Sequence, residues 1–277
     1  YLPKTNSEEL FRIYQLAAEL KLLVFSHVRE PNILSIQEAI ANAAMTGTAL
    51  HLVHINSMAL GQIQLALNMI SSANQKGLDI STELYSYTAA ATLLNSAFFD
   101  EGWQDRLGIS YGDLQWVANG ERLTKDTFDS YRKTGGTVII HMMKPEWIKT
   151  GIAYPGVMIA SDGMPYSPLA HPRTAGTFSR VLGKYVRDEN VLSLNEAIEK
   201  MTLLPAKRLE NTSPMMRFKG RIQVGADADI TIFNPNTIAD QASFEKGLKF
   251  STGIEYVLVN GAIVLRNGKT QENVFAG

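Results

Sequence analysis

The chain has 277 residues, 45% hydrophobic and 19% charged, a composition that suits a packed globular core and excludes a disordered chain. It carries 26 Lys and Arg against 27 Asp and Glu, and this net charge of −1 argues against nucleic acid as a partner. The sequence has no cysteine, which excludes zinc–thiolate sites and a cysteine nucleophile in these residues. No apolar run approaches the ~18 residues that span a membrane, so a membrane partner is not expected either.

The first 85 residues alternate between amphipathic and wholly apolar segments. Apolar residues at helical spacing predict helices over 7–21, 35–46 and 61–74. Ser7 is the expected N-cap of the first helix, and Ser35 with Glu38 forms a predicted capping box for the second. Short apolar runs predict strands at 22–27, 49–55 and 78–85. Strands of this kind are typical of parallel sheets covered by helices, so the alternation predicts βαβ units.

The next region, 86–136, is longer, contains several glycines and is rich in aromatic residues, as expected of a functional lid over a site. A short helix is predicted inside it at 124–133. Beyond it the pattern predicts two strands and then two helices: 137–142, 157–161, about 176–187 and 194–209.

After Pro214 the pattern becomes that of a β-structure. Strands are predicted over 222–233 and within 253–266, and Asn260-Gly261 and Asn267-Gly268 are hairpin signals. The length fits one large domain, such as a barrel of roughly 250 residues, or a medium domain with a small one. We therefore expect an α/β domain over 1–217 and a small β module over 218–277.

Three polar residues follow predicted parallel strands: His27, His54 and Asp162. Because the carboxyl ends of parallel strands converge on one mouth of a barrel, we expect these side chains to meet there. Two imidazoles and a carboxylate suit a divalent metal such as zinc, and the carboxylate equally suits a general base for a metal-bound water. Each residue alone is more often structural, but the joint pattern predicts a site.

Four further residues have alternatives that the pattern leaves open. His141 follows the strand at 137–140 and either reaches the mouth or packs in the core. Arg173 lies on a proline-rich loop and either binds a substrate carboxylate or lies on the surface. Tyr85 and Tyr87 end the third strand, and either hydroxyl can face the mouth. His51 is on the other face of its strand from the site and is expected to be structural.

Several motifs together resemble the N-acyl-D-amino-acid deacylases, or D-aminoacylases, of the amidohydrolase superfamily. The resemblance is most specific in the stretch that begins with Ser161-Asp162-Gly163 and continues from His171-Pro172-Arg173 to Arg187. It covers essentially the whole chain through further motifs: His27-Val28-Arg29, Leu84–Ala89, Pro205-Ala206-Lys207 and Gly220–Asp229.

The resemblance implies a (β/α)8 TIM-barrel amidohydrolase fold, of which this chain holds strands five to eight, with the C-terminal part of a flanking β-sandwich. It implies that His27 and His54 are ligands of one or two zinc ions. Asp162 would bind the metal, take a proton from the metal-bound water and pass that proton to the leaving amine. Arg173 and Tyr87 match the positions that hold the substrate's α-carboxylate, and residues 86–136 match an insertion over the mouth.

Two departures from the family pattern matter. Asn56 stands where relatives often have a lysine that helps to bind the carboxylate, which predicts a shift in substrate choice. The family's His-x-His of strand one and its bridging ligand have no counterpart here. We therefore expect the chain to be part of a longer polypeptide, or to pair with its missing N-terminal half. Alone, it should bind metal weakly and be inactive.

The expected function is metal-dependent hydrolysis of the amide bond of N-acyl-D-amino acids, with a small-molecule N-acyl amino acid as substrate. Two alternatives remain at this point: a cyclic-amide hydrolase, such as a dihydroorotase or hydantoinase, and a catalytically inactive binding module. We expect a cytoplasmic protein, although a secretion signal would lie upstream of Tyr1, and a homo-oligomer is compatible with the sequence.

Overall fold

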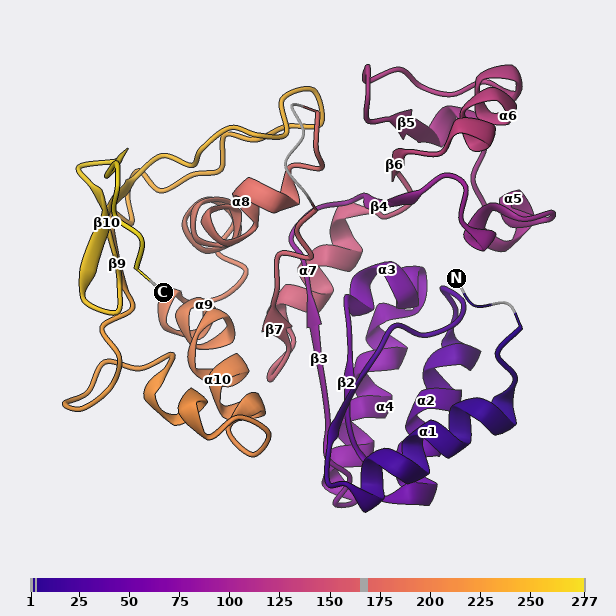
Figure 1. The fold of residues 1–277 in the computed structure, drawn as a ribbon, viewed down its shortest axis with the longest axis horizontal. Helices are drawn as coiled ribbons and strands as arrows, with labels where there is room; N and C mark the ends of the chain where they lie inside the picture. The colour runs from indigo at the N-terminus through magenta and orange to yellow at the C-terminus, as the bar shows by residue number, and fades with distance from the viewer. Residues whose placement is uncertain (1, 3, 165–168, 277) are drawn as a thin grey trace.

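A parallel four-stranded sheet lies at the centre of the computed structural model, which describes residues 2, 4–164 and 169–276. Its strands follow the order β1-β2-β3-β7 and pair in register, with Leu50 opposite both Val24 and Ile80. Figure 1 shows the sheet running through the middle of the molecule. The strands span Leu23–Ser26, Ala49–Leu52, Ile80–Leu84 and Met158–Ile159. The predicted βαβ alternation is therefore confirmed.

Helices connect these strands and cover the sheet. Helix α1 contacts β1, α2 contacts β2, and both α4 and α7 contact β3. Two shorter elements, α3 and the 3-10 turn η1, lead from β2 into α4. The elements are α1 (Ser7–Glu19), α2 (Ile33–Thr46), α3 (Ile55–Ala59), η1 (Leu60–Gln62), α4 (Ile63–Gln75) and α7 (Pro145–Ala153).

Asparagine, not serine, caps the first two helices. The side chain of Asn6 accepts from the amide of Glu9 at 2.8 Å, and that of Asn32 accepts from the amide of Ser35 at 3.0 Å. The predicted Ser7 cap and the predicted capping box at Ser35 are therefore wrong. In each helix an asparagine oxygen accepts from the amide three residues downstream, one of the orphan amides of the first turn, which leaves both serines inside that turn.

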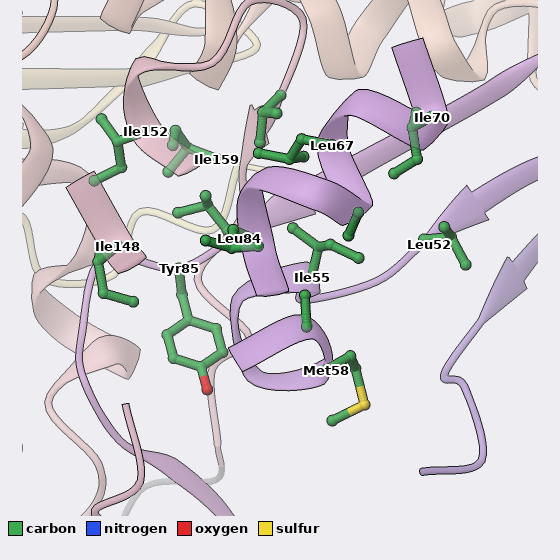
Figure 2. Packing of buried hydrophobic residues seen from close by; sticks show 14 of the residues in the cluster. Leu52, Ile55, Met58, Leu67, Ile70, Leu84, Tyr85, Ile148, Ile152 and Ile159 are labelled. Atoms are coloured by element: carbon green, nitrogen blue, oxygen red, sulfur yellow. The ribbon is translucent and has the colours of Figure 1, made fainter. Parts of the chain in front are cut away.

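The main core lies between the sheet and its helices. Figure 2 shows Leu84 of β3 surrounded by apolar side chains from α4, α7 and β7. Leu84 and Ile152 are fully buried at 0% exposure, and Leu67 is at 1%. Burial of each such side chain contributes about 1.5–3 kcal/mol, so this layer fixes the strand order on which the site depends.

The aromatic-rich region is a small folded subdomain, which we call the insertion (residues 90–142). Its strands form an antiparallel sheet in the order β4-β6-β5, so the strand predicted at 137–142 belongs to the insertion and not to the parallel sheet. Aromatic rings fill its own core, with Trp103 stacked on Phe128 at 5.4 Å. Its elements are β4 (Ala90–Leu93), η2 (Ala97–Phe99), α5 (Trp103–Leu107), η3 (Tyr111–Asp113), β5 (Leu114–Trp116), α6 (Lys125–Thr134) and β6 (Thr137–Ile140).

The C-terminal part begins with helices and ends in a second antiparallel sheet of order β11-β10-β9-β8. Asn260 and Asn267 lie in the left-handed region, each followed by glycine, so both predicted hairpins are confirmed. The strand predicted over 222–233 begins only at Ile230. The elements are α8 (Arg173–Arg180), the π-helical η4 (Val181–Asp188), α9 (Leu194–Met201), α10 (Leu203–Leu209), η5 (Pro214–Phe218), β8 (Ile230–Phe233), β9 (Ile254–Val259), β10 (Ala262–Arg266) and β11 (Lys269–Thr270).

Across the described ranges, none of the helices combines the length and the apolar character that crossing a membrane requires.

Candidate active site

One cavity lies where the carboxyl ends of the four parallel strands meet. His27 follows β1, His54 follows β2, Tyr85 follows β3 and Asp162 follows β7, and all four line the cavity. Arg173, the first residue of α8, joins them. The remaining lining comes from α3 and from the insertion: Ser57, Met58, Ala90, Ala91, Thr92, Phe98, Ile140 and Met142. The convergence expected from a parallel sheet is thus present.

The two histidine rings stand edge to face, with their centroids 4.7 Å apart. His27 Nδ1 donates to the carbonyl of Val28 at 2.8 Å, so the ring proton is assigned to Nδ1 and the lone pair to Nε2. His54 Nδ1 lies 3.0 Å from the hydroxyl of Ser57, which in turn donates to the His54 carbonyl. A histidine oriented in this way through Nδ1 is suited to ligate a metal through Nε2.

The backbone at His54 and Asp162 is unusual. Both residues lie in the left-handed region, with φ of 35° and 48°, which costs energy for residues other than glycine. The amide of His54 donates to the carboxylate of Glu83 at 2.8 Å, which holds this conformation in place. Burial, with a smaller contribution from His27, lowers the pKa of His54 to about 4, so the ring is neutral at pH 7, the form that binds metals.

Asp162 and Arg173 form an ion pair, with Asp162 Oδ2 2.9 Å from Arg173 Nη1. Burial raises the pKa of the Asp162 carboxyl, although Arg173 and His27 act in the opposite direction. The Arg173 side chain is 4% exposed, its guanidinium lies 4.6 Å over the Tyr85 ring, and its Nε has no hydrogen-bond partner among the described residues. Within the described residues, the guanidinium of Arg173 therefore keeps one unused hydrogen-bond donor beside the cavity.

Tyr85 presents a second unsatisfied donor. Burial raises the pKa of its phenol to about 12, so the hydroxyl keeps its proton. The hydroxyl lies near Ser57 and Arg173, but it makes no hydrogen bond of normal geometry within the described part of the chain. Unpaired buried donors of this kind are rare, and this one belongs to a residue that lines the cavity, where a bound molecule can supply the acceptor.

The residues present fit a divalent metal in part. No group of three or more His, Asp or Glu side chains lies close enough to hold a metal within residues 4–164 and 169–276. Two imidazoles nevertheless stand edge to face at the cavity, a donor set typical of zinc. Asp162 is turned toward Arg173, so His27 and His54 are the ligands that this chain offers in this arrangement.

Three residues expected at the site do not line the cavity. The Tyr87 hydroxyl donates to Asp240 at 2.8 Å. Asn56 is fully buried and donates to the Tyr85 carbonyl at 3.2 Å, and His141 shares a 2.9 Å hydrogen bond with Gln115. The structure therefore presents Tyr85, and not Tyr87, at the mouth.

Sequence reasoning missed two residues that support the site. Ser57 orients His54, and only its spacing of three residues from the histidine signals this role. Glu83 holds the His54 amide and lies 3.6 Å from His51 Nε2, while His51 Nδ1 lies 2.7 Å from Ser81 Oγ. His51 is thus a buried residue outside the cavity, as expected.

Comparisons with known proteins agree with this geometry. Residues 36–265 match the model of the amidohydrolase family. An N-acyl-D-glutamate deacylase of Alcaligenes xylosoxydans xylosoxydans is 31% identical over 271 residues, which cover 92% of this chain and 54% of that protein. A D-aminoacylase of the same organism is 33% identical over 232 residues, 78% of this chain and 44% of that one.

A solved structure is similar over nearly the whole chain. The crystal structure of N-acyl-D-glutamate deacylase from Bordetella bronchiseptica, complexed with zinc and a phosphonate inhibitor, superposes with a TM-score of 0.81 at 29% identity. The match covers 94% of this chain and 56% of that one. The chain therefore spans about half the length of the relatives it matches.

Proposed function

Because the chain belongs to the amidohydrolase family, we propose that it is the C-terminal half of a zinc-dependent hydrolase of N-acyl-D-amino acids. The observation that carries this proposal is the cavity in which His27, His54 and Asp162 meet Arg173. The relatives named as deacylases support a linear amide as the bond that is cleaved.

The proposed chemistry needs a polarised amide carbonyl and an activated water. Zinc held by His27 and His54 would supply Lewis-acid chemistry, polarising the carbonyl and lowering the pKa of water toward ~7. Asp162 takes one proton from the attacking water as the new carbon–oxygen bond forms. It then donates the proton to the nitrogen as the carbon–nitrogen bond breaks, which leaves a carboxylic acid and an amine. The proton of the acid passes to the amine, so the final products are a carboxylate and an ammonium group.

Arg173 and Tyr85 are the proposed carboxylate-binding groups. A substrate α-carboxylate satisfies the unpaired Nε of Arg173 and the hydroxyl of Tyr85, both buried next to the histidines. A charge-assisted bond to a guanidinium fixes the carboxylate and, with it, the orientation of the scissile amide. Asn56 acts indirectly in this proposal, because its amide supports the Tyr85 backbone and does not reach the cavity.

The rest of the cavity wall suits an apolar part of the substrate. Met58 comes from α3, and Phe98, Ile140 and Met142 come from the insertion. Arg173 is the one cation among the described residues that line the cavity, and it is already assigned to the α-carboxylate. A neutral substrate side chain or acyl chain therefore fits this wall best.

The proposed partner is the N-terminal half of the same polypeptide. Strands β1 and β7 are the edges of the parallel sheet, and the side chains of Leu22 and Phe25 beside one edge are 46% and 54% exposed. An uncovered parallel edge with apolar neighbours favours pairing with further strands. We propose that residues 1–217 complete a barrel in this way, and that residues 218–277 complete a β-sandwich.

The test is hydrolysis by the complete polypeptide loaded with zinc. We expect it to release the free D-amino acid from N-acetyl-D-amino acids and to leave the L-enantiomers intact. Ring opening of dihydroorotate or a hydantoin, without hydrolysis of any N-acetyl-D-amino acid, would establish the cyclic-amide alternative instead. Zinc binding without turnover of either substrate class would establish an inactive binding module.

A further inference from the structure

A long arm, residues 239–252, connects β8 and β9 of the C-terminal antiparallel sheet and extends to the end of the parallel sheet. Figure 1 shows it in orange and yellow between β8 and β9, running from the second sheet toward α8. Its two limbs pair through Ala239 and Thr252. The arm turns at its far end, where Ser243 and Lys246 exchange two backbone hydrogen bonds.

The arm is docked tightly along its length. Asp240 accepts from the hydroxyl of Tyr87 at 2.8 Å and from Arg180 at 2.9 Å. Ser251 donates to the carbonyl of Ala175 in α8 at 3.2 Å. A Cβ added at Gly247 would lie 1.5 Å from the carbonyl oxygen of Ala170, so the backbones are in direct contact there. The arm is therefore part of the architecture around the mouth.

Phe244, at the turn of the arm, contacts both the insertion and the end of the parallel sheet. Its ring centroid lies 4.7 Å from that of His141, 5.2 Å from that of His171 and 6.3 Å from that of Tyr87. Its carbonyl accepts from the side chain of Gln115 at 3.0 Å. Edge-to-face aromatic contacts of this kind fix the relative orientation of their elements.

His171 connects Phe244 to the site. It is 1% exposed, its Nε2 donates to the carbonyl of Ala89 at 2.8 Å, and its Nδ1 accepts from the amide of Arg173 at 3.0 Å. The ring therefore fixes where α8 begins and hence where the Arg173 guanidinium emerges. Among the described residues, Phe244, Tyr85 and Tyr87 have aromatic rings that pack on it.

We propose that Phe244 is a positioning residue for the reaction. Through His171 its ring holds Arg173 where a substrate carboxylate binds, and through His141 its ring holds the insertion over the cavity. The bond from Gln115 goes to the backbone carbonyl and does not depend on the Phe244 side chain. The part that concerns the carboxylate rests on the proposed function. The part that concerns the insertion stands on the contacts alone.

The experiment compares Phe244→Ala, Phe244→Leu and the matched control Phe250→Ala in the complete zinc-loaded polypeptide. Phe250 lies on the same arm but is 80% exposed. We expect Phe244→Ala to raise KM for an N-acetyl-D-amino acid by about tenfold or more, while kcat changes by less than about threefold. Phe244→Leu should recover part of the loss, and Phe250→Ala should behave as the parent.

Hydrogen exchange gives a readout that needs no turnover. Amides of 90–93, 114–116 and 137–141 should exchange about tenfold faster in Phe244→Ala, with the zinc content unchanged. Parent-like exchange in that variant, or equal effects of Phe244→Ala and Phe250→Ala, would overturn the inference. If Phe244→Ala does not fold, Phe244→Leu decides by the same exchange measurement. A parent without deacylase activity refutes the proposed function alone, because exchange still tests the arm.

Discussion

Replacing Arg173 by alanine tests the proposed carboxylate site most directly. Its side chain is buried beside the cavity, one nitrogen is paired with Asp162, and Nε has no acceptor among the residues that the structure describes. The hydrogen bond between Nε and the substrate carboxylate contributes about 1.5–3 kcal/mol, which is lost with the side chain. At about 1.4 kcal/mol per factor of ten, kcat/KM should fall by about tenfold to a hundredfold.

The assay compares each N-acetyl-D-amino acid with its neutral carboxamide analogue. Removing Arg173 should penalise the carboxylate substrate by this full factor and the carboxamide much less, because the analogue lacks the charged partner. Arg173→Lys keeps the charge but loses the planar fork, and should recover only part of the loss. Equal losses on both substrates would refute the carboxylate-binding role and leave Arg173 with a purely structural one.

Three further predictions concern the acid–base group, the core and the pH response. Asp162→Asn should lower kcat by about 10²–10⁴-fold with zinc content unchanged by mass spectrometry, and parent-like turnover would contradict its role. Leu84→Ala, at a fully buried site, should lower the free energy of unfolding by about 2–5 kcal/mol in urea titrations. Leu93→Ala, at a side chain 52% exposed, should stay within about 0.5 kcal/mol, so similar losses would contradict the packing assigned to Leu84. Burial, reinforced by a nearby arginine in each case, lowers the pKa of His141 to about 4 and that of His171 well below 6.5. Below pH 6.5 the unfolded chain therefore binds more protons than the folded one. The contribution of these two histidines to the free energy of unfolding should be fully present above about pH 6.5 and should decrease as the pH drops toward 4. An unfolding midpoint that is constant from pH 7.5 to 4.5 would contradict this assignment.

The sequence by itself determined the parallel sheet and which strand-terminal residues meet in the candidate cavity. Apolar strands and amphipathic helices are encoded by local patterns, and the carboxyl ends of parallel strands must lie at one edge. His27, His54 and Asp162 therefore converge as expected, and Arg173 joins them on the following helix. The hairpins at Asn260 and Asn267 could also be predicted from local sequence, because each needs only a two-residue turn signal.

Only the tertiary structure decided which tyrosine faces the mouth and what covers it. Tyr85 and Tyr87 both follow β3, and the choice between them depends on Asp240, more than 150 residues away, which binds the Tyr87 hydroxyl. The sheet of the insertion likewise pairs 90–93 with 137–140, a contact that no local pattern contains. The docking of Phe244 on His141 and His171 is of the same kind. Local periodicity specifies an element and its buried face. Long-range contacts decide which residue becomes the hydrogen-bond partner of a buried polar group and which side chains pack against a buried ring.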